Sequence, residues 1–211
     1  MKPYDVKEVF KELYKPADTP HLIHIPQMAF CTVSGSGNPN DPEGSYKQAV
    51  ELLYAVSYAL REQMKRTVER QGFQGYVVPP LEGLWWQPGR QGYDMMQKET
   101  LHWISQIRLP DFVTADDFNR ALQQVQLTKK CDPSLVQYRV YEEGLCVQIM
   151  HHGAFDDETA SVLKMDEFIA SEGYINDFSD LRHHHEIYLS NINRVVESRW
   201  KTILRHPIRR P

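Results

Sequence analysis

The sequence predicts an α+β protein made of two tandem strand-helix-strand-strand modules, related by pseudo-twofold symmetry, with a ligand cleft between them. Two observations predict this class. Short runs rich in β-branched and aromatic residues alternate with longer runs whose apolar residues recur every three or four positions, and the same order of runs occurs twice. A chain of 211 residues can bury one core without disulfides or a metal ion. We therefore expect a single domain over 1–211, with module one at about 20–110 and module two at about 111–208.

The first module is predicted from changes in the hydrophobic period. Leu53, Val56 and Leu60 recur at helical spacing between Tyr46 and Arg70. The flanking runs are rich in Val, Ile, Phe and Trp, which favours strands. The expected elements are a strand at 22–33, a turn at 34–42, a helix at 46–70 and strands at 75–86 and 100–109.

The second module repeats this order after a connecting helix. Thr114 is the expected N-cap of that helix, because its side-chain oxygen can accept from a free amide and two acids follow it. A Glu142-Glu143-Gly144 turn is expected to join two strands. We expect the helix at 156–171 to be equivalent to the helix at 46–70. The expected strands lie at 136–141, 145–151, 184–189 and 201–204.

Composition limits the partners of the chain. The net charge is −4 and charged residues make up 25%, so no electrostatic grip on nucleic acid or on an anionic membrane is expected. No apolar run approaches the roughly 20 residues of a membrane-spanning helix, and no apolar leader precedes the first strand. We expect a cytoplasmic protein with a small-molecule partner, and the sequence leaves its oligomeric state open.

No cofactor or metal is expected. The three cysteines, Cys31, Cys131 and Cys146, lie far apart and form no zinc spacing. The His183-His184-His185 run sends its side chains to both faces of a strand, and no Cys or acidic triad accompanies it. The Gly35-Ser36-Gly37 loop lacks the lysine of a phosphate-binding loop.

The segment around Glu186 is the strongest candidate for chemistry. Side chains of a strand alternate, so Glu186 and Tyr188 share one face with His184, whereas Ile187 and Leu189 share the other and are expected to pack under the helices. If the Glu186 face meets solvent, the arrangement is unremarkable. If it lines a cleft, a carboxylate among aromatic rings is a costly feature that function would explain. The residues alone leave both interpretations open.

The second candidate segment contains two adjacent tryptophans. Strict alternation groups Glu82 with Trp86 and places Trp85 with Gly83. A bulge at Gly83 would exchange the two rings, so the sequence does not decide which Trp faces the cleft. Both can equally be core residues. His152, at the end of a predicted strand, is a possible hydrogen-bond donor inside the cleft.

Seven short motifs, in order across about residues 10–208, resemble the stand-alone branch of the GyrI-like small-molecule-binding family. The motifs are Ile25-Pro26-Gln27-Met28, Gly35-Ser36-Gly37-Asn38-Pro39-Asn40, Leu53-Tyr54, Pro79-Pro80-Leu81-Glu82-Gly83-Leu84-Trp85-Trp86, Pro110-Asp111-Phe112-Val113, His184-His185-Glu186-Ile187-Tyr188-Leu189 and Thr202-Ile203-Leu204-Arg205-His206-Pro207. The resemblance implies tandem modules around a ligand cleft. It also implies a bulky aromatic or cationic ligand, because drug-sensing relatives place an acid on the strand that matches Glu186-Ile187-Tyr188.

Some members of that branch hydrolyse the cyclopropane of spirocyclopropyl DNA-alkylating agents within an aromatic cage. By resemblance, Glu186 and Tyr188 are the expected catalytic residues. An alternative is sequestration of aromatic or cationic molecules without turnover, with Glu186 as the counter-charge. The expected ligand-binding residues are Glu82, Trp85, Trp86, Trp103, Phe112 and His152.

Overall fold

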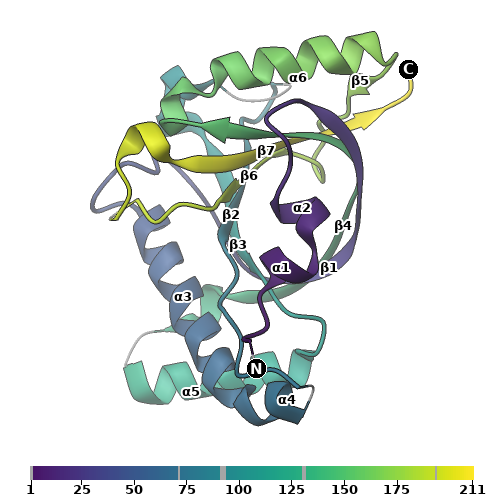
Figure 1. Ribbon diagram of the computed structural model, residues 1–211. Coiled ribbons are helices and arrows are strands. Elements are labelled where there is room, and N and C mark those ends of the chain that lie inside the picture. Colours follow the sequence, from purple (N-terminus) through teal and green to yellow (C-terminus); the bar gives the residue numbers. More distant parts are fainter. Residues whose placement is uncertain (1, 71, 91–93, 130–131, 193) are drawn as a thin grey trace.

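The computed structural model describes residues 2–70, 72–90, 94–129, 132–192 and 194–211, and at its centre six antiparallel strands form a closed barrel (Figure 1). The barrel closes because β4 pairs with both β1 and β7. A short strand, β5 (Ile175–Asn176), pairs with the outer end of β7. In spatial order the barrel strands are β1 (His21–Ser36), β3 (His102–Arg108), β2 (Leu81–Trp86), β6 (His184–Tyr188), β7 (Lys201–Arg209) and β4 (Gln137–His152).

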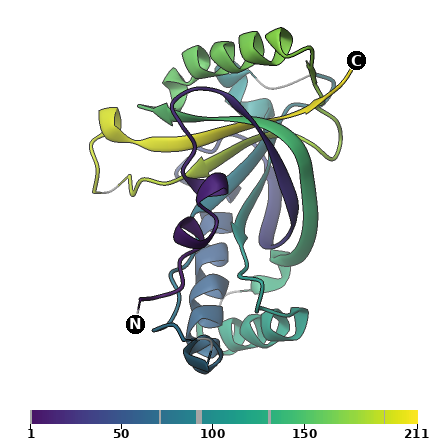
Figure 2. The same ribbon diagram turned by 45° about the vertical axis from the view of Figure 1, so that its right-hand side comes forward.

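The helices surround this barrel. Figures 1 and 2 show α3 and α6 outside the barrel wall, with the short N-terminal helices at one side of the barrel. Short 3-10 turns occur at 95–100, 133–135, 155–157 and 197–199. The helices are α1 (Val6–Val9), α2 (Lys11–Tyr14), α3 (Ser45–Gln63), α4 (Lys65–Arg70), α5 (Ala115–Lys129) and α6 (Thr159–Ser171).

The mixed α+β class is confirmed, and several boundaries differ from expectation. The helix expected at 46–70 is divided at Met64 into α3 and α4. The helix expected at 156–171 begins with a 3-10 turn, and its α-helical part starts at Thr159. The tandem modules and their pseudo-twofold symmetry stay a prediction, since no comparison of the two halves tests them.

The expected Glu142-Glu143-Gly144 turn is wrong. These residues lie inside β4, which runs without interruption from Gln137 to His152. Glu143 is only 3% exposed and binds His185 and Arg205. Two acids followed by a glycine are locally typical of a turn. In the structure, His185 and Arg205 from distant strands bind Glu143, and this pairing stabilises a buried charge within β4.

The helix N-cap at Thr114 is confirmed. The Thr114 hydroxyl accepts from the Asp117 amide at 3.2 Å, and the Asp117 carboxylate accepts from the Thr114 amide at 2.9 Å. This reciprocal pair satisfies amide groups that the first turn of a helix leaves free. It fixes the start of α5, which packs against α3 and contacts the barrel where the Phe118 ring lies 5.7 Å from that of Tyr138 of β4.

The strand registers assign the two faces of the barrel wall. Gly83 pairs with Glu186, and Trp85 pairs with both His184 and Trp103, so these side chains lie on one face. This face is the outer one, because the helices cover it. Leu53 and Val56 of α3 belong to the large hydrophobic core, whereas α6 builds a second cluster. The second cluster consists of Val147, Ile149, Met165, Ile169, Leu204 and Ile208.

The inner face carries Ile187, which corrects one expectation. Ile187 pairs in register with Glu82 and Ile203 and is 1% exposed. It is a core residue as expected, but it points into the barrel and not under the helices. Leu189 lies beyond the end of β6 and packs partly buried against the same core. Strand alternation separates the two faces correctly, but it does not indicate which face a helix covers.

A buried polar network fills part of the barrel interior. Arg205 donates to Glu143 Oε2 at 3.0 Å, and His185 bridges Glu143 and Glu82 at 3.0 and 3.1 Å. Desolvation opposes the charge on His185, but the two carboxylates prevail and raise its pKa to about 9. Tyr14 of α2 donates to Glu82 at 3.1 Å, so the network also fastens the N-terminal helices to the barrel.

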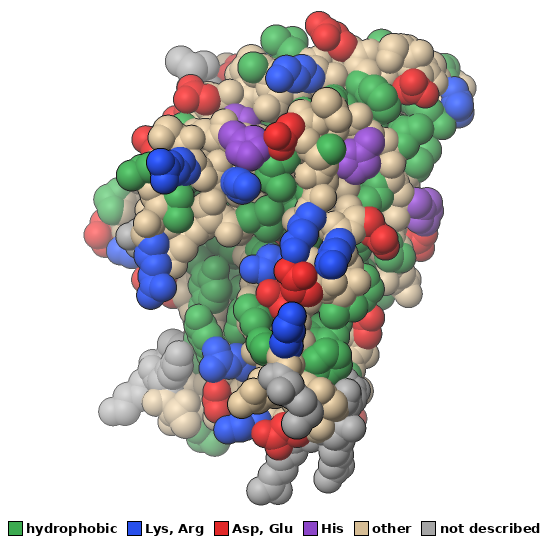
Figure 3. Space-filling model, in the orientation of Figure 1, with side chains coloured by type: hydrophobic (Ala, Val, Ile, Leu, Met, Phe, Trp, Pro, Cys, Tyr) green, Lys and Arg blue, Asp and Glu red, His purple; other side chains and the backbone are tan. Residues whose placement is uncertain are grey.

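One face of the molecule carries charged side chains of both signs. Figure 3 shows Lys and Arg side chains intermingled with Asp and Glu on the face that bears the N-terminal helices. None of the helices in the described residues is long and apolar enough to cross a membrane. Cys31 and Cys146 are buried and free, whereas Cys131 lies outside the described residues.

Candidate functional site

The candidate site lies on the outer face of the wall, where β2 meets β6. Glu186 stands opposite Gly83 at this junction and is 4% exposed. Trp85 Nε1 donates to Tyr188 Oη at 3.1 Å, and the Tyr188 hydroxyl hydrogen-bonds the Glu186 carboxyl group. Because Tyr188 has one hydroxyl proton, its bond to Glu186 orients that carboxylate.

Aromatic rings from several elements surround this hydrogen-bonded chain. Tyr46, at the start of α3, packs with ring centroids 5.3 Å from Trp85 and 5.1 Å from Trp103. On the other side, Phe155 packs edge-on against Tyr188 at 5.2 Å. Such edge-to-face contacts stabilise the cluster by about 0.5–1.5 kcal/mol each beyond burial. Aromatic rings therefore form the wall around this hydrogen-bonded chain.

Two glycines make room for the tryptophan rings. A Cβ at Gly35 would stand 2.4 Å from the Trp103 ring, and a Cβ at Gly83 would stand 2.5 Å from Trp85 Nε1 and 3.1 Å from Tyr188 Oη. A real Cβ atom does not approach a ring as closely as 2.4 or 2.5 Å, so a larger residue at Gly35 or Gly83 would displace the ring. The rings can lie flat on the sheet because glycine occupies the position beneath each of them.

We expect Gly83→Ala to damage the site without removing any functional group. The added methyl displaces the Trp85 indole or the Tyr188 hydroxyl, so the bond that orients Glu186 is lost. The expected result is a changed Trp fluorescence spectrum and weaker ligand binding, with retention of the folded circular-dichroism spectrum. Because the methyl collides with the Trp85 indole, Gly83→Ala should cost less thermal stability in a Trp85→Ala background than in the wild type. An unchanged spectrum and affinity in Gly83→Ala would contradict this account of the site.

A second carboxylate approaches Glu186 from α6. Glu158 occupies the N-cap position of that helix and is 2% exposed. Neither of its carboxylate oxygens has a hydrogen-bond partner among the described residues. His184 Nε2 lies 3.4 Å from Glu186 Oε1 and 3.9 Å from Glu158 Oε1. Two buried acids and an imidazole therefore converge on one point behind the aromatic rings.

Burial controls the ionisation of the two acids. Desolvation raises the pKa of Glu186 to about 7, although the hydrogen bond from Tyr188 lowers it. Desolvation, followed by the charge of Glu186, raises the pKa of Glu158 well above its ordinary value. Like charges this close cannot both ionise easily, so the pair holds a proton near neutral pH. Glu186 therefore changes its protonation state near neutral pH.

The same three side chains are the candidates for holding a metal ion. Donor atoms of Glu158, His184 and Glu186 lie within 4.8 Å of one another. Carboxylate and imidazole donors suit several divalent metals. The sequence predicts that no metal is needed, and we treat the three groups as a proton-sharing cluster. A chelation experiment below distinguishes the two possibilities.

Four of the sequence-predicted residues meet at this site: Glu186, Tyr188, Trp85 and Trp103. The question of which tryptophan joins Glu186 is decided in favour of Trp85, because the register between β2 and β6 is regular and no bulge occurs at Gly83. Trp103 is 1% exposed and lies behind Tyr46. Trp86 points to the other face, where it stacks on His183 with ring centroids 4.0 Å apart.

The other three predicted residues lie elsewhere. Glu82 is on the inner face and is bound by Tyr14, Gln106 and His185. Phe112 packs against Tyr4 and Tyr76 near the N-terminus. His152 is at the surface, where it contacts Asp18 at 2.8 Å. The structure therefore does not bring these three side chains to Glu186.

Sequence reasoning missed Tyr46, Glu158 and Phe155. Tyr46 was assigned only as the start of a helix, and Glu158 follows Asp156 and Asp157 in a run that resembles an ordinary acidic first turn. No local signal separates a buried acid in such a run from exposed ones. The approach of His184 to both acids depends on the packing of α6 over β4 and β7, which brings the N-cap residue of α6 to β6.

The sequence predicts a ligand cleft between two modules, whereas Glu186 is enclosed by protein and is 4% exposed. The described residues line a cavity of about 390 Å³ that reaches Trp85 and Trp86, with Phe178 and His183 on its other side. A second hollow, about 530 Å³, lies near Lys15 and His21. Glu186 lines neither of these two. Access of a ligand to Glu186 therefore requires the surrounding aromatic side chains to move.

A buried acid among packed aromatic rings, on the outer wall of a barrel, is the candidate small-molecule-binding site. In agreement, residues 18–209 match the GyrI-like small-molecule-binding domain. The chain belongs to this family. No curated protein sequence matches it.

Solved structures support the same assignment. An uncharacterized conserved protein from Listeria innocua is 37% identical, with a TM-score of 0.88 over 97% of this chain and 99% of that chain. A protein described as a hydrolase encoded by lin2189, also from Listeria innocua, is 38% identical, with a TM-score of 0.84 over 99% of this chain and 100% of that chain. The C-terminal domain of EcmrR is 14% identical, with a TM-score of 0.56 over 92% of this chain and 98% of that chain, and it shares the fold alone.

Proposed function

We propose that this protein is a xenobiotic hydrolase that opens the cyclopropane of spirocyclopropyl DNA-alkylating agents with water. The observation that carries the proposal is the buried Glu186, whose pKa is raised to about 7, among the rings of Tyr46, Trp85 and Tyr188. The hydrolase description of the Listeria innocua structure that is 38% identical to this chain supports it. The choice of cyclopropanes rests on the resemblance of the sequence motifs.

The chemistry needs a base, a flat binding surface and little else. Water attacks the less hindered cyclopropane carbon, and the breaking carbon–carbon bond sends its electron pair into the dienone ring, which becomes an aromatic phenolate. Glu186 accepts the proton of the attacking water, and the phenolate takes up a proton to give the phenol. Tyr188 and Trp85 hold the base in position. The π-faces of the rings stabilise carbon that becomes electron-poor, by about 0.5–2 kcal/mol per contact for a full cation.

Sequestration without turnover is the second candidate. The aromatic rings and the ionised form of Glu186 favour flat cations, which need no reaction to bind. The raised pKa favours the hydrolase, because an acid kept half-protonated near neutral pH is a weaker counter-charge than an ionised one. Mixing a cyclopropanoid in large excess with the protein tests the choice. We expect complete conversion to the ring-opened phenol, whereas consumption that stops at one equivalent would establish sequestration.

We expect exhaustive chelation to leave hydrolysis unchanged. Glu158, His184 and Glu186 can perform the proton transfer with oxygen and nitrogen atoms alone. The measurement is the rate of phenol formation before and after treatment with a chelator, together with the metal content of the protein. Loss of activity that one particular divalent ion restores would identify the three side chains as metal ligands.

A further inference from the structure

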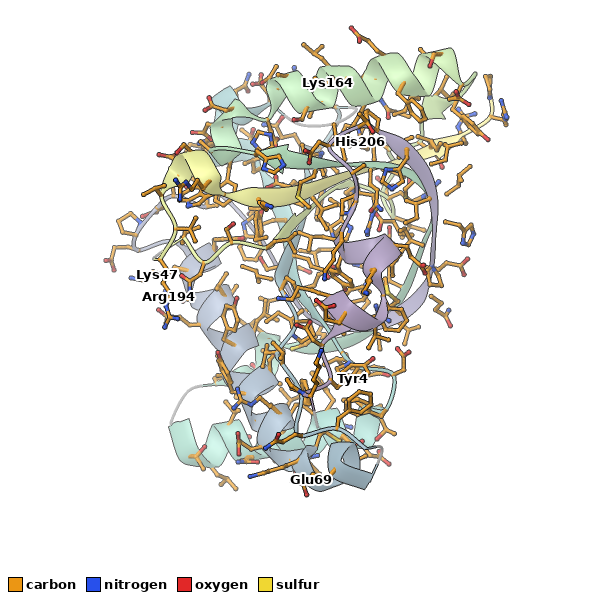
Figure 4. All side chains as sticks on the ribbon, viewed as in Figure 1. Tyr4, Lys47, Glu69, Lys164, Arg194 and His206 are labelled. Atoms are coloured by element: carbon orange, nitrogen blue, oxygen red, sulfur yellow. The ribbon has the colours of Figure 1, made fainter. Side chains whose placement is uncertain are left out.

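A line of side chains connects the buried acids with the surface beneath α6. His184 Nδ1 lies 2.7 Å from His206 Nε2, while the Nε2 atom of His184 faces Glu186 at 3.4 Å. His206 Nδ1 in turn faces Asp166 Oδ1 of α6 at 4.0 Å. His184 and His206 are 0% and 3% exposed, whereas the side chain of Asp166 is 45% exposed. Figure 4 shows His206 between α6 and the barrel strands.

The two imidazoles are in the state that a relay requires. Desolvation lowers the pKa of His184 and of His206 to about 3 each, so both rings are neutral at the pH of function. A neutral imidazole has one donor and one acceptor nitrogen, and at 2.7 Å one ring must donate to the other. His206 Nδ1 has no hydrogen-bond partner among the described residues, and the carboxylate it faces is Asp166. One bridging water or a side-chain rotation of Asp166 closes that gap.

During hydrolysis, the enclosed Glu186 needs a path by which it loses the proton that it accepts. Glu186 gains a proton from water in each turnover, while the phenolate forms elsewhere on the substrate. Glu158 offers no exit for this proton, because neither of its carboxylate oxygens has a hydrogen-bond partner among the described residues. A bound ligand also shields the ring side of the site from solvent. The proton therefore has to leave through the protein, on the side away from Tyr188.

We propose that His184, His206 and Asp166 form a proton relay that returns Glu186 to its ionised state after each turnover. Glu186 gives its proton to His184 Nε2, the Nδ1 proton of His184 passes to His206 Nε2, and the Nδ1 proton of His206 passes to Asp166. Both rings end with the proton on Nε2, and one proton has moved from the buried acid to an exposed carboxylate. Solvent then removes it, and tautomer exchange, which returns the proton of each ring to Nδ1, resets the relay.

Other charged groups near the path do not offer a shorter one. His151 influences Glu186 from β4, but its ring contacts Ser161 Oγ at 3.0 Å and the Ala154 carbonyl at 2.9 Å, so both nitrogens are engaged. His185 lies on the inner face, bound to Glu82 and Glu143. The Phe178 ring packs edge-on against His206 at 5.0 Å and excludes water from that side.

The relay predicts a measurement that does not depend on hydrolysis, although the purpose of the relay rests on the proposed function. After a rapid pH jump from about 6 to about 8, across the pKa of Glu186, infrared spectroscopy follows the loss of its carboxylic-acid stretch. The band is assigned by its absence in Glu186→Gln. In His206→Phe we expect deprotonation to slow by about tenfold or more, and a small diffusible base such as imidazole to restore part of the rate. The equilibrium pKa should change little.

His24→Phe is the matched control, because His24 is exposed on β1 and the replacement is the same. Asp166→Asn is the second variant, since it removes the terminal acceptor from an exposed position and should fold even if His206→Phe does not. Deprotonation as fast as in the wild type in Asp166→Asn and in folded His206→Phe would overturn the relay. If the wild type fails to turn over a cyclopropanoid, the proposed function fails, but the pH jump still decides whether the relay exists.

Discussion

Glu186→Gln is expected to lower the rate of cyclopropane hydrolysis by roughly 10²–10⁴, the usual contribution of a positioned proton acceptor. Glutamine keeps the size and polarity of the side chain but accepts no proton from water. Binding of the neutral ring-opened product should change little, because the rings of Tyr46, Trp85 and Tyr188 remain. The measurement is single-turnover phenol formation, with product affinity from Trp fluorescence.

The same variant has an expected effect on stability with a definite sign. Burial raises the pKa of Glu186 to about 7, above the 4.5 of an ordinary glutamate, so the native protein retains a proton that the unfolded chain has lost. Native stability therefore falls as the pH rises through this range, and a glutamine escapes that loss. We expect Glu186→Gln to melt at a higher temperature than the wild type at about pH 8 and at nearly the same temperature at about pH 5. Full activity together with an unchanged pH dependence of melting would show that the carboxylate has no role.

Arg205→Met is expected to cost about 3–5 kcal/mol of unfolding free energy, because it removes the guanidinium that pairs with the buried Glu143 carboxylate. Arg205 is 1% exposed and donates to Glu143, to Gln148 at 3.0 Å and to the Leu13 carbonyl at 3.2 Å. Methionine has a similar length and fills much of the space. Urea unfolding followed by circular dichroism gives the difference.

Arg120→Met is the matched control. The side chain of Arg120 is 60% exposed and pairs with Asp117 on the surface of α5, where such pairs contribute about 0–1 kcal/mol. The double variant Arg205→Met/Glu143→Met should recover part of the loss, since it removes both charges and leaves His185 paired with Glu82. Equal stability of Arg205→Met and Arg120→Met would contradict the importance of the interior network.

The sequence by itself determined the family and the elements that carry the site. The strand around Glu186-Ile187-Tyr188, the Trp85-Trp86 strand and the Thr114 N-cap are found within a few residues of their expected positions. The reason is that strand alternation, capping and helical periodicity are local patterns of a few residues. Motif order then indicated the family over nearly the whole chain, and the comparison confirmed it.

Only the tertiary structure decided which of these residues meet. Glu82 and Glu186 occupy neighbouring strands and similar motifs, yet the register places them on opposite faces, one bound by His185 and the other beside Tyr188. Glu158 could not be recognised from the sequence, because Asp156-Asp157-Glu158 resembles the solvated first turn of a helix. Its position beside His184 depends on the packing of α6 over β4 and β7, which brings the start of α6 to β6. Local patterns fix which side of a strand a residue occupies, whereas long-range packing fixes what faces it.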